Sequence, residues 1–204
     1  MSPRQPQLTR EQFVQRFSLH RQHQTLRPSH SRLKLSAVLI PVVERAEGLS
    51  LILTQRANQL RHHAGQISFP GGRYEDGDQH LLNTALRETE EEIGLPREQV
   101  EVLGQLRDYP TRFNFLIRPF VALVSPQQPL RAQAGEVAEI FEVPLAAVLH
   151  QDNHYAYRIP LYIYDRVYFI PWQQRNIWGA TAGILRELAD HVQPEQRLHF
   201  RPLN

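Results

Sequence analysis

Three glutamates spaced for one face of a helix have the clearest capacity for chemistry in this sequence. Glu88, Glu91 and Glu92 follow Arg87 in the run Arg-Glu-Thr-Glu-Glu-Glu. On an α-helix, positions i, i+3 and i+4 are neighbours, so the three carboxylates would share a patch about one turn long. Like charges at this spacing destabilise a helix, and so does negative charge near its C-terminus. A hard divalent cation, Mg²⁺ or Mn²⁺, would reverse both penalties; a solvated acidic face is the alternative.

A helix over Asp78–Ile93 is predicted to carry these glutamates and to end at Gly94. Its apolar residues recur at helical spacing and should form the buried stripe, on the side opposite the glutamates. The stripe consists of Leu82, Ala85, Leu86 and Ile93, with the polar Thr89 on the same side. Upstream, Phe69-Pro70-Gly71-Gly72 predicts a turn, because two glycines permit positive φ and close backbone approach.

The stretch from Gly72 to Leu95 resembles the Nudix box, in which a glycine and then an acidic residue precede Arg-Glu-apolar-any-Glu-Glu-any-Gly-apolar. The second half matches at every specified position except Thr89, where the family has an aliphatic residue. Asp78 takes the place of the usual glutamate, and one extra residue separates it from Arg87. The resemblance therefore leaves the role of Asp78 open.

The resemblance implies a role for each matching residue. Glu88 and Glu92 would be the principal metal ligands, and Glu91 a third carboxylate that acts as a further ligand or as a base. Arg87 would pair with these glutamates and orient them. The implied fold is α/β, a mixed β-sheet sandwiched between α-helices, with the box forming a loop-helix-loop.

The implied reaction is hydrolysis of a pyrophosphate. Metal ions neutralise the charge of the diphosphate and activate the attacking water, while a carboxylate takes its proton. In this family the base can lie in a later loop, where Glu136 and Glu139 are candidates; each could equally be a solvated loop residue. Of the two, Glu136 is the one we name as catalytic.

A second pattern indicates the substrate. Leu53-Thr54-Gln55-Arg56-Ala57, then Arg61, Gly65 and Phe69-Pro70-Gly71-Gly72, resemble the signature of coenzyme A pyrophosphatases of the NudL type, as does the stretch Ile177–Leu185. The implied products are 3′,5′-ADP and 4′-phosphopantetheine, or acyl-phosphopantetheine from an acyl derivative. Arg56, Arg61, Gly71 and Gly72 would bind substrate, since guanidinium groups form paired bonds with phosphate. Alternatively, one arginine only braces the loop.

Two other functions remain open at this stage. The first is a Nudix hydrolase of another nucleoside diphosphate derivative, such as ADP-ribose or a dinucleoside polyphosphate. The second is a non-catalytic nucleotide- or RNA-binding module of the same fold. The presence of both arginines disfavours the first, and the presence of all three box glutamates disfavours the second.

Composition sets wider limits. The 204 residues are 41% hydrophobic and 22% charged, which is ordinary for a globular protein, and the absence of cysteine excludes disulfides and thiolate chemistry. The longest apolar run, Leu35–Val43, is too short to span a bilayer, and the N-terminus lacks the apolar region of a secretory signal. We therefore expect a cytoplasmic protein with a small-molecule substrate and neither a membrane nor a nucleic-acid partner; a homodimer is compatible with the family.

The chain is predicted to consist of a basic, partly helical extension (1–32), a Nudix domain (33–191) and a tail (192–204). Residues 1–34 carry a net charge of +6, which could contact nucleic acid or anionic lipid but is more simply a set of solvated arginines. The extension should contain a helix over about 9–23 with a Thr9–Gln12 capping box and Phe13, Phe17 and Leu19 as apolar anchors. Further predicted strands are 35–43, 49–54, 66–69, 100–106, 115–124, 137–143, 155–164 and 166–170; further helices are 144–149 and 178–191, the last with Ile177 at helical spacing.

Overall fold

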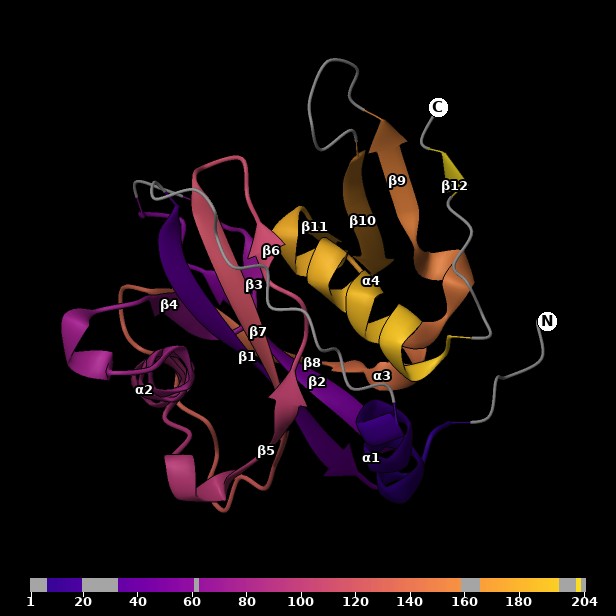
Figure 1. The fold of residues 1–204 in the computed structure, drawn as a ribbon, viewed down its shortest axis with the longest axis horizontal. Coiled ribbons are helices and arrows are strands. Elements are labelled where there is room, and N and C mark those ends of the chain that lie inside the picture. The colour runs from indigo at the N-terminus through magenta and orange to yellow at the C-terminus, as the bar shows by residue number, and fades with distance from the viewer. Residues whose placement is uncertain (1–6, 20–32, 61–62, 159–165, 195–200, 203–204) are drawn as a thin grey trace.

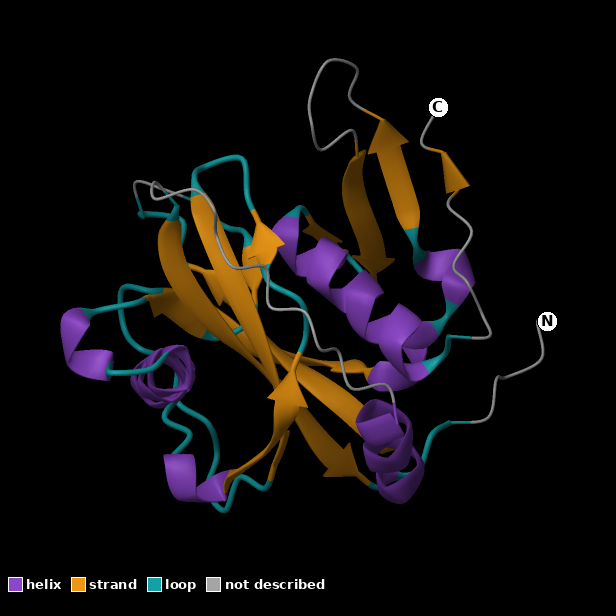
Figure 2. Cartoon of the chain, in the orientation of Figure 1, coloured by secondary structure: helices purple, strands orange, loops and turns teal. Residues whose placement is uncertain are grey.

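The computed structural model describes residues 7–19, 33–60, 63–158, 166–194 and 201–202. These residues form two sheets and four α-helices (Figures 1 and 2). The main sheet contains β1 (Lys34–Arg45), β2 (Gly48–Arg56), β3 (Ile67–Ser68), β4 (Gly71–Arg73), β5 (Val100–Gln105), β6 (Tyr109–Pro110), β7 (Phe115–Val124) and β8 (Val137–Pro144). The smaller sheet contains β9 (Tyr155–Arg158), β10 (Arg166–Trp172), β11 (Arg175–Trp178) and β12 (Arg201–Pro202). The helices are α1 (Arg10–Leu19), α2 (Leu81–Ile93), α3 (Leu145–Leu149) and α4 (Ala180–Val192).

The main sheet is mixed, with the strand order β3-β2-β1-β7-β5; β4 pairs with β1, β6 with β7 and β8 with β2. β1 and β2 form an antiparallel hairpin, whereas β1 and β7 are parallel from Lys34↔Phe115 to Val43↔Val124. β1 is central, and its residues 39–43 are all buried, on both faces of the sheet, which explains its nearly continuous apolar sequence.

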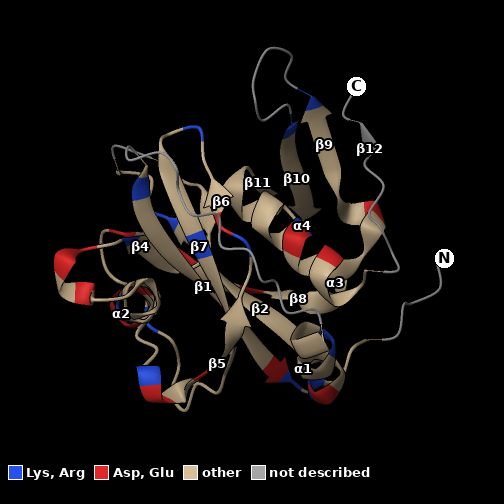
Figure 3. Cartoon of the chain, in the orientation of Figure 1, with Lys and Arg blue, Asp and Glu red and all other residues tan. Residues whose placement is uncertain are grey.

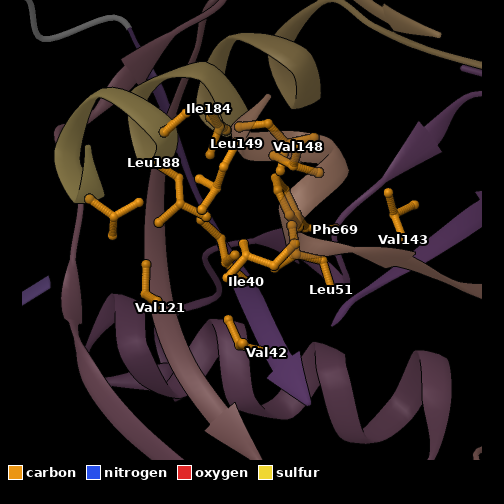
Figure 4. Close-up of a cluster of buried hydrophobic side chains, with 14 of the residues drawn as sticks. Ile40, Val42, Leu51, Phe69, Val121, Val143, Val148, Leu149, Ile184 and Leu188 are labelled. Carbon is orange, nitrogen blue, oxygen red and sulfur yellow. The ribbon is translucent and has the colours of Figure 1, made fainter. Parts of the chain in front are cut away.

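Helices cover both faces of this sheet. α2 packs on one face, where Ala85 and Ile93 meet Leu39, Ile52 and apolar residues of β7. On the other face α1, α3 and α4 enclose a larger apolar cluster, part of which Figure 4 shows. Its labelled members are Ile40, Val42, Leu51, Phe69, Val121, Val143, Val148, Leu149, Ile184 and Leu188. The mixed sheet between α-helices confirms the predicted α/β/α fold.

The smaller sheet has the order β11-β10-β9-β12 and packs against α4, which lies between it and the main sheet (Figure 1). The predicted helix over 178–191 is wrong at its start. Ile177 pairs with Ile170 in a β-hairpin, and α4 begins after Gly179, whose φ is 68°. The apolar periodicity misled here because Ile177 and α4 face the same core, although they belong to different elements.

Two other predicted boundaries also change. The predicted helix over Asp78–Ile93 divides into a short 3₁₀ helix over Asp76–Asp78 and the α-helix that begins at Leu81. The predicted turn at Gly71 and Gly72 is a strand instead: β4 pairs antiparallel with β1 through Gly72↔Ala37 and Gly71↔Val38. Both glycines are therefore fixed by the sheet.

α1 begins at the predicted capping box, in which the Thr9 hydroxyl accepts from the Gln12 amide and the Gln12 side chain accepts from the Thr9 amide. Phe13 and Phe17 are buried, but Leu19 is 70% exposed and is not an anchor. The helix ends at Leu19, and the remainder of its predicted span lies outside the described residues. Among the residues that the structure describes, no helix combines the length and apolar character needed to cross a membrane.

Candidate active site

The two glycines of β4 lie directly beneath the acidic helix α2. A Cβ on Gly72 would lie 2.3 Å from the carboxyl group of Glu88, and one on Gly71 would lie 2.4 Å from the carbonyl oxygen of Ala37. Gly71 also has a φ of 152° and donates its amide to Glu92 at 3.1 Å. Any larger residue would therefore displace either a glutamate or the central strand. In the structure, the two glycines that were predicted to bind substrate therefore lie against the box glutamates, Gly72 against Glu88 and Gly71 against Glu92.

Arg87 organises the acidic cluster. Its Nη1 lies 3.0 Å from Glu88 Oε1 and 3.4 Å from Glu91 Oε2, and its Nη2 donates to the carbonyl of Arg73. Its Nε and Nη2 also donate to the two carboxylate oxygens of Asp78, at 2.8 and 3.1 Å. This bidentate contact fixes the plane of the guanidinium, so that the remaining nitrogen faces the glutamates.

Asp78 is the functional residue for which the sequence provided no role. Its side chain is buried, and it also accepts from the Thr84 hydroxyl at 2.8 Å and the Glu75 amide at 3.0 Å. The hydrogen bonds from Arg87 hold the pKa of Asp78 well below its usual range, and the same contact raises the pKa of Arg87. The extra residue before Arg87 is accommodated in the short connection between the 3₁₀ helix, which ends at Asp78, and α2, which begins at Leu81. The side chain of Asp78 therefore still reaches Arg87.

The three box glutamates differ in exposure. Glu91 is exposed, Glu88 is half-buried, and Glu92 is only 3% exposed, although helical spacing placed all three on the side away from the buried stripe. Burial raises the pKa of Glu92 to about 7, against the opposing effects of the Gly71 amide and Arg56. Burial likewise raises the pKa of Glu88, which Arg87 partly offsets. The site therefore favours a bound cation or proton.

Thr89, the residue that departs from the family pattern, is fully buried. Its hydroxyl donates to the carbonyl of Ala85, one turn earlier, at 2.6 Å. A threonine can therefore replace an aliphatic residue here, because its polar group is satisfied within the helix.

Arg56 reaches the acidic helix from the end of β2. Its Nη1 lies 3.7 Å from Glu92 Oε1, and its side chain is 29% exposed. Backbone bonds from Arg56 to Gln66 and from Gly65 to Arg56 close the loop that follows. Arg61, the other predicted phosphate ligand, lies outside the described residues.

Glu136 lies on a loop that is hydrogen-bonded to both α2 and β2. The Gln133 amide donates to the Glu92 carbonyl at 2.9 Å, and the Ala57 amide donates to the Glu136 carbonyl at 2.8 Å. The negative charge of Glu136 contributes to the raised pKa of both Glu88 and Glu92. The fold thus places Glu136, some forty residues later in sequence, beside the box glutamates.

Glu139 is separated from this group. It lies in β8 opposite Gln55, and the β2–β8 register shifts just beyond this pair, so that Arg56 pairs with Val137. Its carboxylate forms an ion pair with Arg175 of β11 at 2.6 Å. The structure therefore favours Glu136 over Glu139 as the carboxylate that faces the site.

The donor set at this site is suited to a divalent metal ion. Glu88, Glu91 and Glu92 offer hard oxygen atoms, and acidic residues are present in α2 and in the short helix before it (Figure 3). In the part of the chain that the structure describes, no three acidic or histidine side chains are grouped closely enough to hold a metal ion as they stand. Arg87 and the Gly71 amide donate hydrogen bonds to individual carboxylates of this set. The case for a divalent metal ion at this site therefore depends on the type of donor atom that the three glutamates carry.

Comparison with known proteins agrees with the fold and the box. The model of the NUDIX domain matches residues 33–162, and the chain therefore belongs to the Nudix family. It is an enzyme of the hydrolase class that acts on pyrophosphate bonds.

Two relatives extend the similarity over nearly the whole chain. Each is described as an uncharacterized Nudix hydrolase NudL, one from Shigella flexneri serotype 5b (strain 8401) and one from Escherichia coli O1:K1 / APEC. Both are 42% identical, over 187 and 191 residues respectively, covering 89% of this chain and 94% of each relative. The crystal structure of a MutT/nudix family protein from Enterococcus faecalis covers 96% of this chain and 78% of its own, with a TM-score of 0.52 and 15% identity, which supports the fold alone.

Proposed function

We propose that this Nudix hydrolase cleaves the diphosphate of coenzyme A, or of an acyl or oxidised derivative. The products would be 3′,5′-ADP and 4′-phosphopantetheine, or its acyl form. One observation carries the proposal: Arg56, from the motif that resembles coenzyme A pyrophosphatases, lies 3.7 Å from Glu92 of the acidic helix. The substrate motif and the hydrolytic motif thus meet in one site.

Glu88, Glu91 and Glu92 would hold Mg²⁺ or Mn²⁺ through their carboxylate oxygens. Such a cation, when bound, would neutralise charge on the diphosphate and lower the pKa of water. Arg87 keeps Glu88 and Glu91 oriented, and the Gly71 amide does the same for Glu92. The buried Glu92 favours a cation because its carboxylate is otherwise poorly solvated.

Glu136 would act as the general base. It is exposed and therefore accessible to water, and its backbone is fixed by the Ala57 amide. As the oxygen of water attacks one phosphorus, Glu136 would accept a proton, and the bridging P–O bond would break with its electron pair leaving on the second phosphate. Water and coenzyme A together account for every atom of the two products.

Arg56 and Arg61 would bind phosphate groups of the substrate. A guanidinium can form two parallel charge-assisted hydrogen bonds with a phosphate, and coenzyme A carries both a diphosphate and a 3′-phosphate. The 3.7 Å separation of Arg56 from Glu92 leaves the arginine without a tight carboxylate partner there, so it could engage a phosphate at little cost.

The proposal also includes a cytoplasmic location and is compatible with a homodimer. The absence of cysteine suits a reducing compartment. Light scattering of the purified protein would measure the oligomeric state directly. A monomer would remove the dimer from the proposal without affecting the enzyme chemistry.

The deciding experiment is hydrolysis of coenzyme A, dephospho-coenzyme A and ADP-ribose by the parent enzyme with Mg²⁺ or Mn²⁺, followed by chromatography of the products. We expect release of 3′,5′-ADP from coenzyme A, its loss on chelation with EDTA and its return when the metal is restored. Arg56→Gln should raise KM for coenzyme A more than for dephospho-coenzyme A if Arg56 contacts the 3′-phosphate, and about equally if it contacts the diphosphate.

Cleavage of ADP-ribose or a dinucleoside polyphosphate without cleavage of coenzyme A would retain the hydrolase chemistry and reject the proposed substrate. Metal-independent binding of RNA, with no cleavage of any diphosphate, would instead support the binding-module alternative.

A further inference from the structure

Arg175, in β11 of the smaller sheet, contacts β8 of the main sheet beside the active site. Its Nη2 donates to Glu139 Oε1 at 2.6 Å, and its guanidinium carbon lies 4.5 Å from the ring centroid of Phe141. The side chain of Arg175 is 26% exposed, so the pair is partly shielded from solvent. A planar guanidinium can stack on the ring and bind the carboxylate at the same time. Arg175 therefore restricts the side-chain positions of both Glu139 and Phe141 in β8.

Glu139 lies three residues after Glu136, at the start of β8. The register of β8 with β2 shifts between Gln55 and Arg56, and such bulges re-aim the side chains that follow them. The Ala57 amide holds the Glu136 carbonyl at 2.8 Å. The segment that carries Glu136 is thus held at one end by β2 and at the other by Arg175.

Arg175 lies beyond the residues matched by the family model, which end at 162. It pairs with Trp172 at the closed end of the β10–β11 hairpin. The same hairpin is anchored in the core by Ile170 and Ile177, whose side chains are 2% and 0% exposed. Movement of the backbone at Arg175 would therefore disturb the core beneath it.

We infer that Arg175 is a positioning residue, which acts through Glu139 to hold Glu136 toward Glu88 and Glu92. This inference rests on the proposed function, in which Glu136 accepts the proton from water. Glu136 is exposed. Besides the contact with Ala57, the backbone here is held by two hydrogen bonds to the Gln133 carbonyl. The Glu136 amide donates one at 3.3 Å, and the Val137 amide donates the other at 3.1 Å. A shift of about 1 Å at a catalytic group can reduce a rate by about a hundredfold.

The test is a double-mutant cycle between Arg175→Met and Glu136→Gln, with kcat and KM measured on coenzyme A, or on ADP-ribose if coenzyme A is not cleaved. We expect Arg175→Met to reduce kcat by about tenfold or more while KM changes little. In the Glu136→Gln background the same substitution should have almost no further effect, because the group that it positions is already absent. Arg175→Lys should restore part of kcat, since it keeps the charge but not the stacking.

The same strand offers a matched control. Arg45 and Glu142 form an ion pair of equal length, 2.6 Å, farther along β8. The two pairs have similar exposure, so the control differs chiefly in its greater distance from Glu136 along β8, and Glu142→Gln should leave kcat within about twofold of the parent. Thermal unfolding of every variant would identify any that is not folded at the assay temperature.

The possible failures are distinguishable. If Glu136→Gln is inactive but Arg175→Met retains full kcat, the positioning role is wrong and the base assignment stands. If the two losses multiply, Arg175 acts on stability or on another group, and again only the positioning role is wrong. If Glu136→Gln retains full kcat, both the base assignment and any action of Arg175 through Glu136 are rejected.

Discussion

Arg87 forms a bidentate ion pair with the buried Asp78, at 2.8 and 3.1 Å, and its third nitrogen lies 3.0 Å from Glu88. The carboxylate that anchors the arginine is thus separate from the carboxylates that the arginine orients. This separation allows the acidic cluster to release its contacts with Arg87 to a ligand without loss of the anchor.

Asp78→Asn should lower both stability and activity. Removing the charge leaves the partly buried Arg87 without its counter-ion, at a cost of about 3 kcal/mol. Because the folded-state pKa of Asp78 is depressed, its contribution is present above the ordinary value of 3.8 and is lost as the pH falls below it. Urea unfolding at pH 7 and pH 3 should therefore show a larger difference between parent and variant at pH 7.

Asp108→Asn is the matched control for this experiment. Asp108 forms a similar buried bidentate pair with Arg118, at 2.7 and 2.8 Å, but Arg118, unlike Arg87, is not hydrogen-bonded to any of the described box glutamates. It should lose comparable stability and keep its kcat where it is folded. If the two variants lost kcat equally, the loss in Asp78→Asn would reflect stability alone.

Glu92→Gln should abolish catalysis and yet stabilise the metal-free protein above pH 7. The folded-state pKa of Glu92 is raised from 4.5 to about 7, so its favourable contribution exists below pH 4.5 and is lost as the pH rises through 7. The difference corresponds to about 3 kcal/mol, which the neutral amide avoids. Unfolding in EDTA at pH 5 and pH 8 would measure it.

The same variant tests metal binding. Added Mn²⁺ should raise the Tm of the parent and leave that of Glu92→Gln nearly unchanged, since a ligand stabilises only the state that binds it. A variant that is less stable than the parent at pH 8 in EDTA would show that the Gly71 and Arg56 contacts outweigh the burial of the charge.

Gly72→Ala should reduce kcat by at least about tenfold. Its Cβ would lie 2.3 Å from the carboxyl group of Glu88 and would displace it. Gly77→Ala is the control, because a Cβ there meets no atom within 4 Å and the backbone is not in the left-handed region. Equal activity of the two variants would mean that the position of Glu88 is unimportant for the reaction.

Phe13→Ala should destabilise the protein by about 3 kcal/mol or more, because this fully buried side chain of α1 packs in the main core. Phe113→Ala, which removes a side chain that is 67% exposed, should change stability little. A small effect of Phe13→Ala in chemical unfolding would show that α1 is dispensable to the core, as a separate N-terminal extension would be.

Local regularities made much of this protein predictable from its sequence. The alternation and length of the apolar runs predicted β7 at its observed limits and most other strands within a few residues. The i, i+3 and i+4 spacing predicted that Glu88, Glu91 and Glu92 would be neighbours, since that depends only on helix geometry. The capping box predicted where α1 begins for the same reason: its contacts span three residues.

Only the tertiary structure decided which glutamate is buried and which distant groups meet it. Glu92 is contacted by Gly71 from β4 and by Arg56 from β2, and Glu136 lies beside the box glutamates whereas Glu139 forms an ion pair with Arg175. The strand that contains Ile177 was likewise hidden, because residues of a hairpin and of a helix can face one core. Sequence periodicity specifies the face of an element; the partner of that face is set by long-range packing, which the local pattern does not encode.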